Sequence, residues 1–263
     1  MSSNTSTTPA CERAPPLLAV RPETHAFFLD LDGTLLEFAP RPEQVECDAT
    51  LLTLLAQLAT RSAGALALVS GRSIADLDRL TAPHRFPASG VHGLERRSAS
   101  QRPAPQAVSP QALTEARQVL QALARRHPRL LLEDKGISLA LHYRGAPALA
   151  DTISGALASI PALRRGELRV QHGHKVIEVM PAGASKATAI AAFMDEAPFK
   201  GRRPVYVGDD LTDECAFEWV NSHGGLSIAV APVRATAATA ALASVSAVRA
   251  WLQTLTAPPG GAR

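Results

Sequence analysis

Short apolar runs and helical repeats of apolar residues alternate in the first part of the chain. Residues 26–31 and 65–69 form short apolar runs that are typical of buried strands. Between these runs, leucines recur at helical spacing over residues 48–61, and Asp48 stands at the N-cap position. Ser73 and Asp76 have the spacing of a capping box, which predicts the start of another helix. The alternation predicts an α/β fold with a doubly wound parallel sheet.

The pattern changes after residue 95. Residues 96–110 are rich in Arg, Ser and Pro and lack periodicity, which predicts a linker. The following residues predict two helix-and-hairpin units, in the order helix 110–126, strands 130–134 and 137–143, helix 147–160, and strands 167–172 and 174–180. This order predicts a separate two-layer α+β module.

The alternation of strands and helices resumes after residue 183. Helices are predicted over 185–196, 213–220 and 248–255, and buried strands over 204–207 and 226–230. The α+β module is therefore expected to be inserted into the first domain. We expect this division: a disordered lead-in at 1–23, a core at 24–107 and 184–257, the inserted module at 108–183, and a flexible tail at 258–263.

Composition and charge restrict the class of protein. The chain has 263 residues, of which 46% are hydrophobic and 19% charged, as in globular proteins. Only 4% are aromatic and the net charge is +3, which favours a small anionic ligand over nucleic acid. We see no membrane span and no secretory signal. The three cysteines are few, odd in number and far apart, which excludes a disulfide framework and fits the cytoplasm.

Acidic residues gather at the ends of two predicted strands. Asp30 and Asp32 end the first strand and share one face, and Asp209, Asp210 and Asp213 follow the strand over 204–207. Ligands of α/β sheets bind beyond such strand ends. One cluster could be a helix-capping turn, but two clusters of mutually repelling carboxylates predict a cation between them. Their hard oxygen ligands predict Mg²⁺.

A hydroxyl and a lysine complete an anion-binding pattern. Ser70 stands at another strand end, before Gly71 and Arg72, and Lys186 stands at a helix start. Alone, each would be better explained by a turn or by a solvated surface lysine. A serine-hydrolase elbow is excluded because Leu68 replaces its first glycine. The stretch around Lys186 also lacks the spacing of a nucleotide P-loop.

These motifs resemble the four motifs of the haloacid-dehalogenase (HAD) phosphatases. The matching residues are DLDGTL at 30–35, Ser70, Lys186 and GDDLTDE at 208–214. Further stretches resemble bacterial trehalose-6-phosphate phosphatases, namely SGR at 70–72, GVHGLE at 90–95, EDKG at 133–136 and HYR at 142–144. The resemblance covers about residues 24–255, with Ala187 where that family usually has Gly. It implies a Rossmann-like HAD core with an inserted α+β cap.

The resemblance also implies a reaction, in which trehalose 6-phosphate is hydrolysed to trehalose and phosphate as the last step of trehalose biosynthesis. Asp30 would be the nucleophile and Asp32 the general acid and base, while Ser70 and Lys186 would hold the phosphoryl group. Mg²⁺ would be held by Asp30, Asp209 and the main-chain carbonyl of Asp32. Asp210 and Asp213 would hold metal-bound waters or orient Lys186.

Charged residues of the predicted cap form the expected sugar site. Glu133 and Lys135 share a face of one strand, and Glu178 lies on another. The resemblance points to the same three positions as specificity residues. The alternative is a salt bridge between Lys135 and a glutamate. The remaining candidates for substrate binding are Ser70, Gly71, Arg72, His92, His142 and Arg144.

Two other functions stay open. One is a related sugar-phosphate phosphatase or phosphomutase with the same core. The other is a catalytically silent module that binds a sugar phosphate and regulates a synthase. The intact Asp30 and Asp32 argue against it, because a pure binder gains nothing from repelling carboxylates beside a phosphate. We expect a cytoplasmic monomer that binds neither nucleic acid nor membrane.

Overall fold

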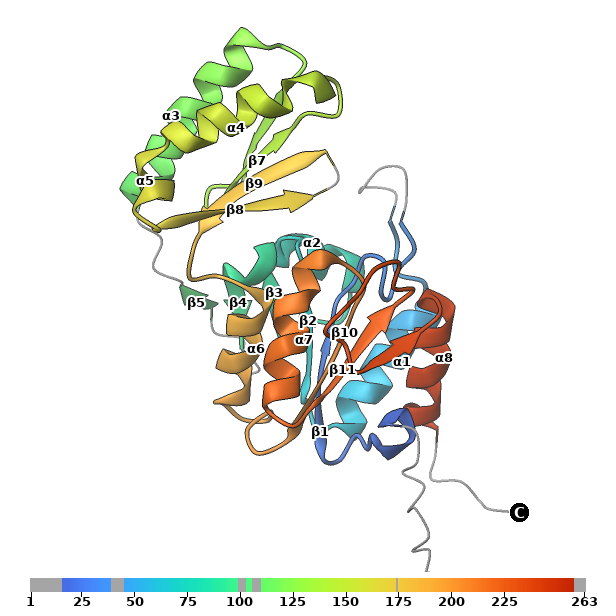
Figure 1. Cartoon of the computed structure of the whole chain (residues 1–263). Coiled ribbons are helices and arrows are strands. Elements are labelled where there is room, and N and C mark those ends of the chain that lie inside the picture. The colour runs from blue at the N-terminus through green and yellow to red at the C-terminus, as the bar shows by residue number, and fades with distance from the viewer. Residues whose placement is uncertain (1–15, 39–44, 99–102, 106–109, 174, 258–263) are drawn as a thin grey trace, which may run out of the picture.

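The computed structural model describes residues 16–38, 45–98, 103–105, 110–173 and 175–257. Two sheets organise these residues, and Figure 1 shows the smaller sheet with its helices above the larger one. No helix of the described segments is both long enough and apolar enough to cross a membrane. The predicted combination of a parallel α/β sheet and an α+β unit is confirmed. The exact division into domains stays a prediction.

The larger sheet contains eight strands among the described residues, in the order β12-β11-β10-β1-β2-β3-β4-β5. The six parallel strands are β1 (His25–Leu29), β2 (Leu66–Val69), β3 (Ala88–Gly90), β10 (Arg203–Gly208), β11 (Leu226–Val230) and β12 (Ala240–Leu242). Because β1 lies between β10 and β2, the carboxyl ends of three motif-bearing strands meet at one edge of the sheet.

The segment expected to be a linker instead begins with sheet structure. Strand β4 (Glu95–Arg97) pairs antiparallel with β3, and β5 (Pro103–Pro105) pairs with β4. Arg97 explains why β4 is fixed, since it is buried and donates to both carboxylate oxygens of Asp78 at 2.6 and 2.7 Å. A charge-assisted pair of this kind is not visible in a sequence pattern.

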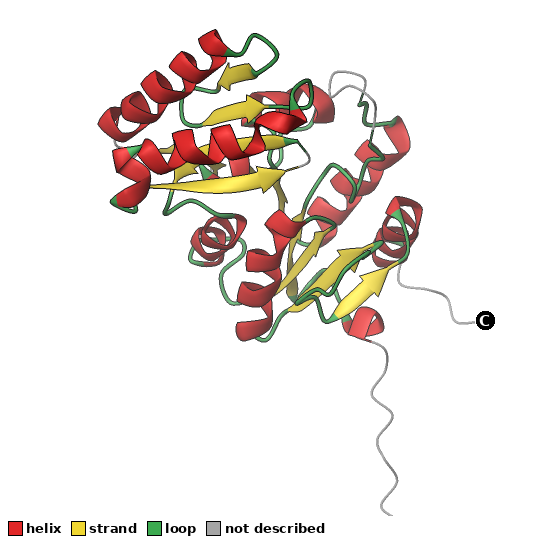
Figure 2. Cartoon of the chain, turned by 45° about the horizontal axis from the view of Figure 1, so that its top comes forward, coloured by secondary structure: helices red, strands yellow, loops and turns green. Residues whose placement is uncertain are grey.

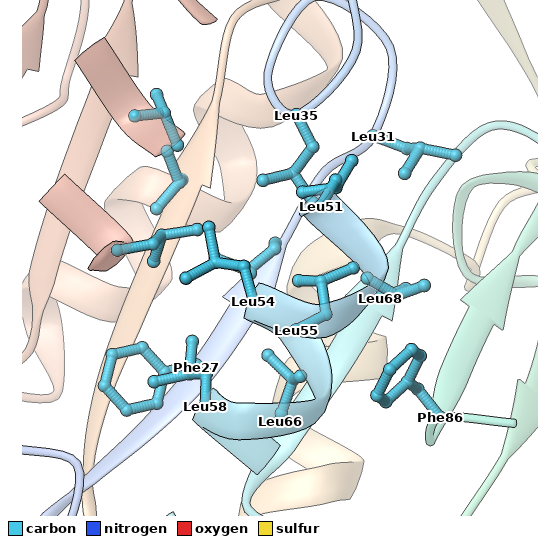
Figure 3. Packing of buried hydrophobic residues seen from close by; sticks show 14 of the residues in the cluster. Phe27, Leu31, Leu35, Leu51, Leu54, Leu55, Leu58, Leu66, Leu68 and Phe86 are labelled. Atoms are coloured by element: carbon cyan, nitrogen blue, oxygen red, sulfur yellow. The ribbon is translucent and has the colours of Figure 1, made fainter. Parts of the chain in front are cut away.

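Helices cover both faces of the larger sheet, which explains why its strands read as continuous apolar runs. Phe27 and Leu29 of β1 face one layer, and Phe28 faces the other. On the first side are α1 (Ala49–Arg61), α2 (Ile74–Thr81) and α8 (Val245–Thr256), and Figure 3 shows the leucines of α1 over β1 and β2. On the second are α6 (Lys186–Met194) and α7 (Glu214–Ser222). The N-caps predicted at Asp48 and Ser73 are both present.

The smaller sheet is the predicted α+β insert. Its antiparallel strands, in the order β6-β7-β9-β8, are β6 (Leu131–Asp134), β7 (Leu139–His142), β9 (Val176–Pro181) and β8 (Leu168–Gly173). Helices α3 (Pro110–Arg126), α4 (Ala150–Ser159) and α5 (Pro161–Arg164) pack on its apolar face (Figure 2). Its polar face is left toward the larger sheet.

The expected disorder of residues 1–23 is wrong for residues 16–23. Pro16–Ala19 form a short 3-10 helix, and Val20 is buried in the core. The core anchors this segment further, because Arg202 donates to the carbonyls of Pro22 and Glu23. Residues 1–15 and the expected tail at 258–263 lie outside the described residues.

Candidate active site

A cleft of about 710 Å³ lies between the carboxyl ends of the core strands and the polar face of the insert. This volume suits a small-molecule ligand. Nearly all of the predicted site residues line it, namely Asp30, Asp32, Ser70, Gly71, Arg72, His92, Glu133, Lys135, His142, Glu178, Lys186, Asp209 and Asp210. The structure therefore brings together residues from both parts of the core and from the insert.

Two predicted residues are placed elsewhere. Asp213 is fully buried beneath the cleft rather than lining it. Arg144 is exposed in the turn that follows β7, and it is absent from the cleft lining among the described residues. The turn, closed by a hydrogen bond from Ala146 N to Tyr143 O, leads the chain away from the sheet. The prediction that Arg144 binds substrate is therefore not supported.

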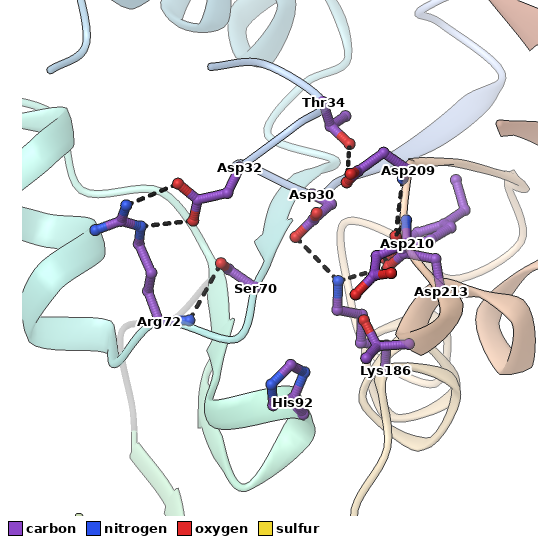
Figure 4. Close-up of polar contacts among 12 residues, drawn as sticks. Asp30, Asp32, Thr34, Ser70, Arg72, His92, Lys186, Asp209, Asp210 and Asp213 are labelled. Atoms are coloured by element: carbon purple, nitrogen blue, oxygen red, sulfur yellow. Dashed lines mark hydrogen bonds and ion pairs between the residues drawn. The ribbon is translucent and has the colours of Figure 1, made fainter. Parts of the chain in front are cut away.

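Lys186 stands at the centre of the buried charges. Its Nζ lies 3.0 Å from Asp30 Oδ1 and 2.5 Å from Asp213 Oδ1, and its side chain is 2% exposed (Figure 4). Burial alone would lower the pKa of Lys186, but attraction to Asp213 and Asp30 outweighs it and raises the pKa above its usual range. The lysine is therefore a fixed cation beside Asp30.

Asp213 has a supporting position, because each of its carboxylate oxygens already accepts two hydrogen bonds. Oδ1 accepts from Lys186 and from the hydroxyl of Tyr206, and Oδ2 accepts from the main-chain N–H groups of Asp209 and Asp210. A carboxylate has about four lone-pair positions, so these bonds use its capacity. Sequence analysis missed the fully buried Tyr206, whose one signal is a hydroxyl within an apolar strand.

The acidic residues suit a divalent cation. Oxygens of Asp30, Asp209 and Asp213 lie within 4.8 Å of one another, and Lys186 is the cation that contacts two of them. Burial, reinforced by Asp213, raises the pKa of Asp30 well above its usual value and that of Asp209 to about 6. Of these three carboxylates, Asp213 is saturated by hydrogen bonds, which leaves Asp30 and Asp209 with lone pairs for a metal.

A glycine lets the loop after β1 lie against Asp209. Gly33 has φ +76°, and a Cβ on it would lie 2.2 Å from Asp209 Oδ2. Thr34, the next residue, donates from its hydroxyl to Asp209 Oδ1 at 3.3 Å. The loop after β1 thus requires a residue without a side chain directly against Asp209.

Asp32 lies in the cleft, but its carboxylate points away from Asp30. Arg72 donates from Nε to Asp32 Oδ2 at 2.6 Å and from Nη2 to Asp32 Oδ1 at 2.7 Å (Figure 4). This bidentate pair raises the pKa of Arg72 further above its usual value. The sequence predicts both residues in the site but not this partnership.

The loop after β2 and a strained turn form the wall beside Lys186. Val91 and His92 both have positive φ, at 46° and 52°, which is costly for side-chain-bearing residues. The turn is held by main-chain bonds from Val91 N to Arg72 O and from His92 N to Ser70 O. His92 is kept neutral, because burial, aided by the charge of Lys186, lowers its pKa to about 4.

Gly71 leaves space for the imidazole ring of His92 and has no side chain to offer a ligand. A Cβ at Gly71 would lie 2.6 Å from the imidazole ring. Ser70 is 1% exposed, and its Oγ accepts from Arg72 N at 3.2 Å. Both residues are in the cleft, as predicted.

The insert contributes a row of polar side chains. Glu133 and Glu178 both stand opposite Ala140 of β7, which places them on one face of the sheet. Glu178 is 7% exposed, accepts from Ser138 Oγ at 2.7 Å and from Lys135 Nζ at 3.1 Å, and lies 3.6 Å from His92 Nε2. The alternative salt bridge between Lys135 and a glutamate is thus present, and the specificity role stays a prediction.

Two further features of the cleft were not predicted. Glu133 lies 3.0 Å from His142 Nε2, so the two candidates form a pair at the cleft mouth. Phe38 also lines the cleft although 72% of it is exposed. An apolar run ending in a loop does not show that its last aromatic residue faces a ligand site.

Comparison with known proteins decides the family. The family model for trehalose-phosphatase matches residues 28–246. The chain belongs to the trehalose-phosphatase family. Its members are phosphoric monoester hydrolases, and HAD chemistry implies a divalent metal, which the acidic cluster suits.

One relative resembles the chain in sequence, and two solved structures resemble it in fold. The chain is 44% identical over 236 residues to trehalose-6-phosphate phosphatase of Escherichia coli (strain K12), which covers 88% of this chain and 86% of that protein. In fold, it resembles the C-terminal domain of C. albicans trehalose-6-phosphate phosphatase, with a TM-score of 0.76, 21% identity, and coverage of 89% and 93%. A HAD phosphatase from Bacteroides thetaiotaomicron gives a TM-score of 0.65 at 15% identity, covering 94% and 99%.

Proposed function

We propose that this trehalose-phosphatase hydrolyses trehalose 6-phosphate to trehalose and inorganic phosphate with the help of Mg²⁺. The observation that carries the proposal is the position of Asp30. It is 5% exposed, lies 3.0 Å from Lys186, and faces a cleft whose opposite wall is the polar face of the insert. A buried carboxylate beside a fixed cation suits attack on a phosphoryl group. The relative from Escherichia coli supports the choice of sugar.

The reaction has two steps. A carboxylate oxygen of Asp30 attacks phosphorus, the bond from phosphorus to the sugar oxygen breaks, and Asp32 gives that oxygen a proton. Water then attacks the aspartyl-phosphate at phosphorus and gives a proton to Asp32, which frees phosphate and regenerates Asp30. The two half-reactions therefore restore both carboxyl groups.

The remaining core residues stabilise charge. Lys186 and Ser70 bind the equatorial phosphoryl oxygens, where negative charge gathers in the transition state. Asp213 and Tyr206 hold Lys186 and the Asp209–Asp210 loop in place. Mg²⁺, held by Asp30, Asp209 and the main-chain carbonyl of Asp32, would reduce the repulsion between the phosphate and its nucleophile.

The insert acts as a cap. Its polar face closes one side of the cleft, which excludes water and supplies groups for the sugar hydroxyls. Glu133, Lys135 and Glu178 offer charged acceptors and a charged donor, and such hydrogen bonds are stronger than neutral ones. The present pairing of Lys135 with Glu178 keeps both groups in the cleft until a sugar arrives.

The test is phosphate release from a panel of sugar phosphates, with Mg²⁺ and with EDTA. We expect trehalose 6-phosphate to be hydrolysed faster than glucose 6-phosphate, and EDTA to abolish both reactions. Phosphate release separates a phosphatase from a phosphomutase, which returns the phosphoryl group to a sugar. Full activity in EDTA would overturn the proposal that the enzyme needs Mg²⁺. Equal rates with trehalose 6-phosphate and glucose 6-phosphate would overturn the proposed substrate assignment.

A further inference from the structure

We propose that Arg72 is a positioning residue that holds Asp32 away from Asp30 until a sugar phosphate takes its place on the arginine. The inference rests on the proposed function, because it concerns the general acid and base of that reaction. In the free enzyme the pair keeps Asp32 from acting, and binding of a sugar phosphate breaks the pair.

The contact between Arg72 and Asp32 uses every oxygen of the carboxylate. Both oxygens accept from the guanidinium, at 2.6 and 2.7 Å, and the two side chains are 12% and 25% exposed. Planar bidentate pairs of this kind fix the carboxylate in orientation as well as in position. Figure 4 shows the carboxylate turned from Asp30 toward Arg72.

The backbone of Arg72 is fixed by hydrogen bonds. Its N–H donates to Ser70 Oγ at 3.2 Å, and its carbonyl accepts from Val91 N at 2.9 Å. Its backbone is thereby joined to the strained turn at His92. The base of the arginine side chain is therefore held at the wall of the cleft.

Asp32 cannot serve the reaction from this position. The leaving oxygen is bonded to phosphorus, and phosphorus must lie against Asp30. A general acid must come within hydrogen-bond reach of that oxygen, at about 2.6–3.2 Å. With both oxygens of Asp32 on Arg72 and the carboxylate turned from Asp30, the group must rotate before catalysis.

A sugar phosphate can provide the exchange. Arg72 lines the same cleft as Asp30, Lys186 and the cap residues, so oxygens of a bound substrate reach its guanidinium. One set of hydrogen bonds to the arginine then replaces another, and Asp32 is released where the leaving oxygen lies. A small phosphate ester that does not reach Arg72 can be turned over only when the pair opens by itself. Its rate is therefore proportional to the fraction of molecules in which the pair is open.

The experiment compares Arg72→Ala with wild type on trehalose 6-phosphate and on p-nitrophenyl phosphate. The p-nitrophenolate of p-nitrophenyl phosphate leaves without needing a proton, but the attack of water on the aspartyl-phosphate still needs Asp32 as a base. We expect kcat for p-nitrophenyl phosphate to rise about three- to tenfold, because Asp32 is released to activate the water that hydrolyses the aspartyl-phosphate. For trehalose 6-phosphate we expect kcat/KM to fall about tenfold or more, as a charged hydrogen bond is lost. Arg72→Lys should be intermediate for both substrates.

The control is the same change in an Asp32→Asn background. There the removal of Arg72 should no longer accelerate p-nitrophenyl phosphate, because no base remains to be released. A merely structural Arg72 would depress both substrates in both backgrounds. An unchanged or lower rate with p-nitrophenyl phosphate, or the same rise with and without Asp32, overturns the inference. If wild type hydrolyses p-nitrophenyl phosphate but not trehalose 6-phosphate, the proposed function fails, while the small substrate still tests the pair.

Discussion

Lys186 Nζ lies 2.5 Å from Asp213 Oδ1, and neither side chain is more than 2% exposed. The same ammonium lies 3.0 Å from Asp30, so one buried cation stands against two carboxylates. Removing it would leave two buried charges unpaired, which proteins tolerate poorly.

Lys186→Ala should therefore destabilise the metal-free protein by about 3–5 kcal/mol, in addition to abolishing turnover. Urea unfolding at neutral pH measures the change. Lys200→Ala, an exposed lysine of the same core, is the control and should change stability by less than about 0.5 kcal/mol. A similarly small effect for Lys186 would show that the buried carboxylates do not depend on it.

Gly33→Ala should prevent metal binding, because the new Cβ would meet Asp209 at 2.2 Å and force its carboxylate aside. Gly201→Ala is a matched control, since Gly201 also has a positive φ, +80°, but has open space around it. Both variants should lose about 1 kcal/mol or more to backbone strain. Only Gly33→Ala should lose the thermal stabilisation that Mg²⁺ gives wild type. Equal stabilisation by Mg²⁺ in both variants would contradict the position of Asp209 at the metal.

Metal binding should depend on pH through Asp209. Its pKa, raised to about 6 by burial and by Asp213, means that the folded protein holds this proton more tightly than the unfolded chain. That proton favours the folded state at low pH, and its contribution is lost as pH rises through about 6. A cation competes with this proton and with that of Asp30, whose pKa is also raised by burial, so its affinity should rise at least about tenfold per pH unit up to about pH 6. Calorimetric titration with Mg²⁺ at several pH values tests this, and a flat affinity from pH 5 to 7 would contradict it.

Glu178→Gln tests the cap. The amide keeps the size of the side chain but weakens acceptance from Lys135, Ser138 and a sugar hydroxyl. We expect kcat/KM for trehalose 6-phosphate to fall roughly tenfold or more, and that for p-nitrophenyl phosphate to fall less. Arg165→Ala, which removes exposed ion pairs of the cap to Glu115 and Glu167, should change neither substrate appreciably. An equal loss for both substrates with Glu178→Gln would indicate a structural role.

The elements predicted best from sequence are those whose signal is local. The helix over Pro110–Arg126 and the strand over Leu226–Val230 begin and end as expected, because a helical repeat defines the first and a short, mostly apolar run defines the second. Strands β3, β4, β5 and β12 were missed. Each has three residues, and long-range pairing fixes them rather than propensity.

The site shows the same limit. The sequence placed Asp30, Lys186 and Asp209 at strand and helix ends, and the topology of the sheet brings them together. It could not show that Asp32 pairs with Arg72 or that Tyr206 supports Asp213, because these contacts depend on side-chain orientation. The sequence also could not show that Arg144 lies outside the cleft lining, since the motif HYR continues past the end of strand β7 at His142.

The central claim is that Asp30 is the nucleophile of a trehalose-6-phosphate phosphatase. The most direct measurement is phosphate release from trehalose 6-phosphate, with saturating Mg²⁺, by wild type and by Asp30→Asn of verified fold. We predict steady turnover by wild type and no release above background by Asp30→Asn, because an amide cannot form the aspartyl-phosphate. No release by wild type, or near-normal release by Asp30→Asn, would contradict the claim.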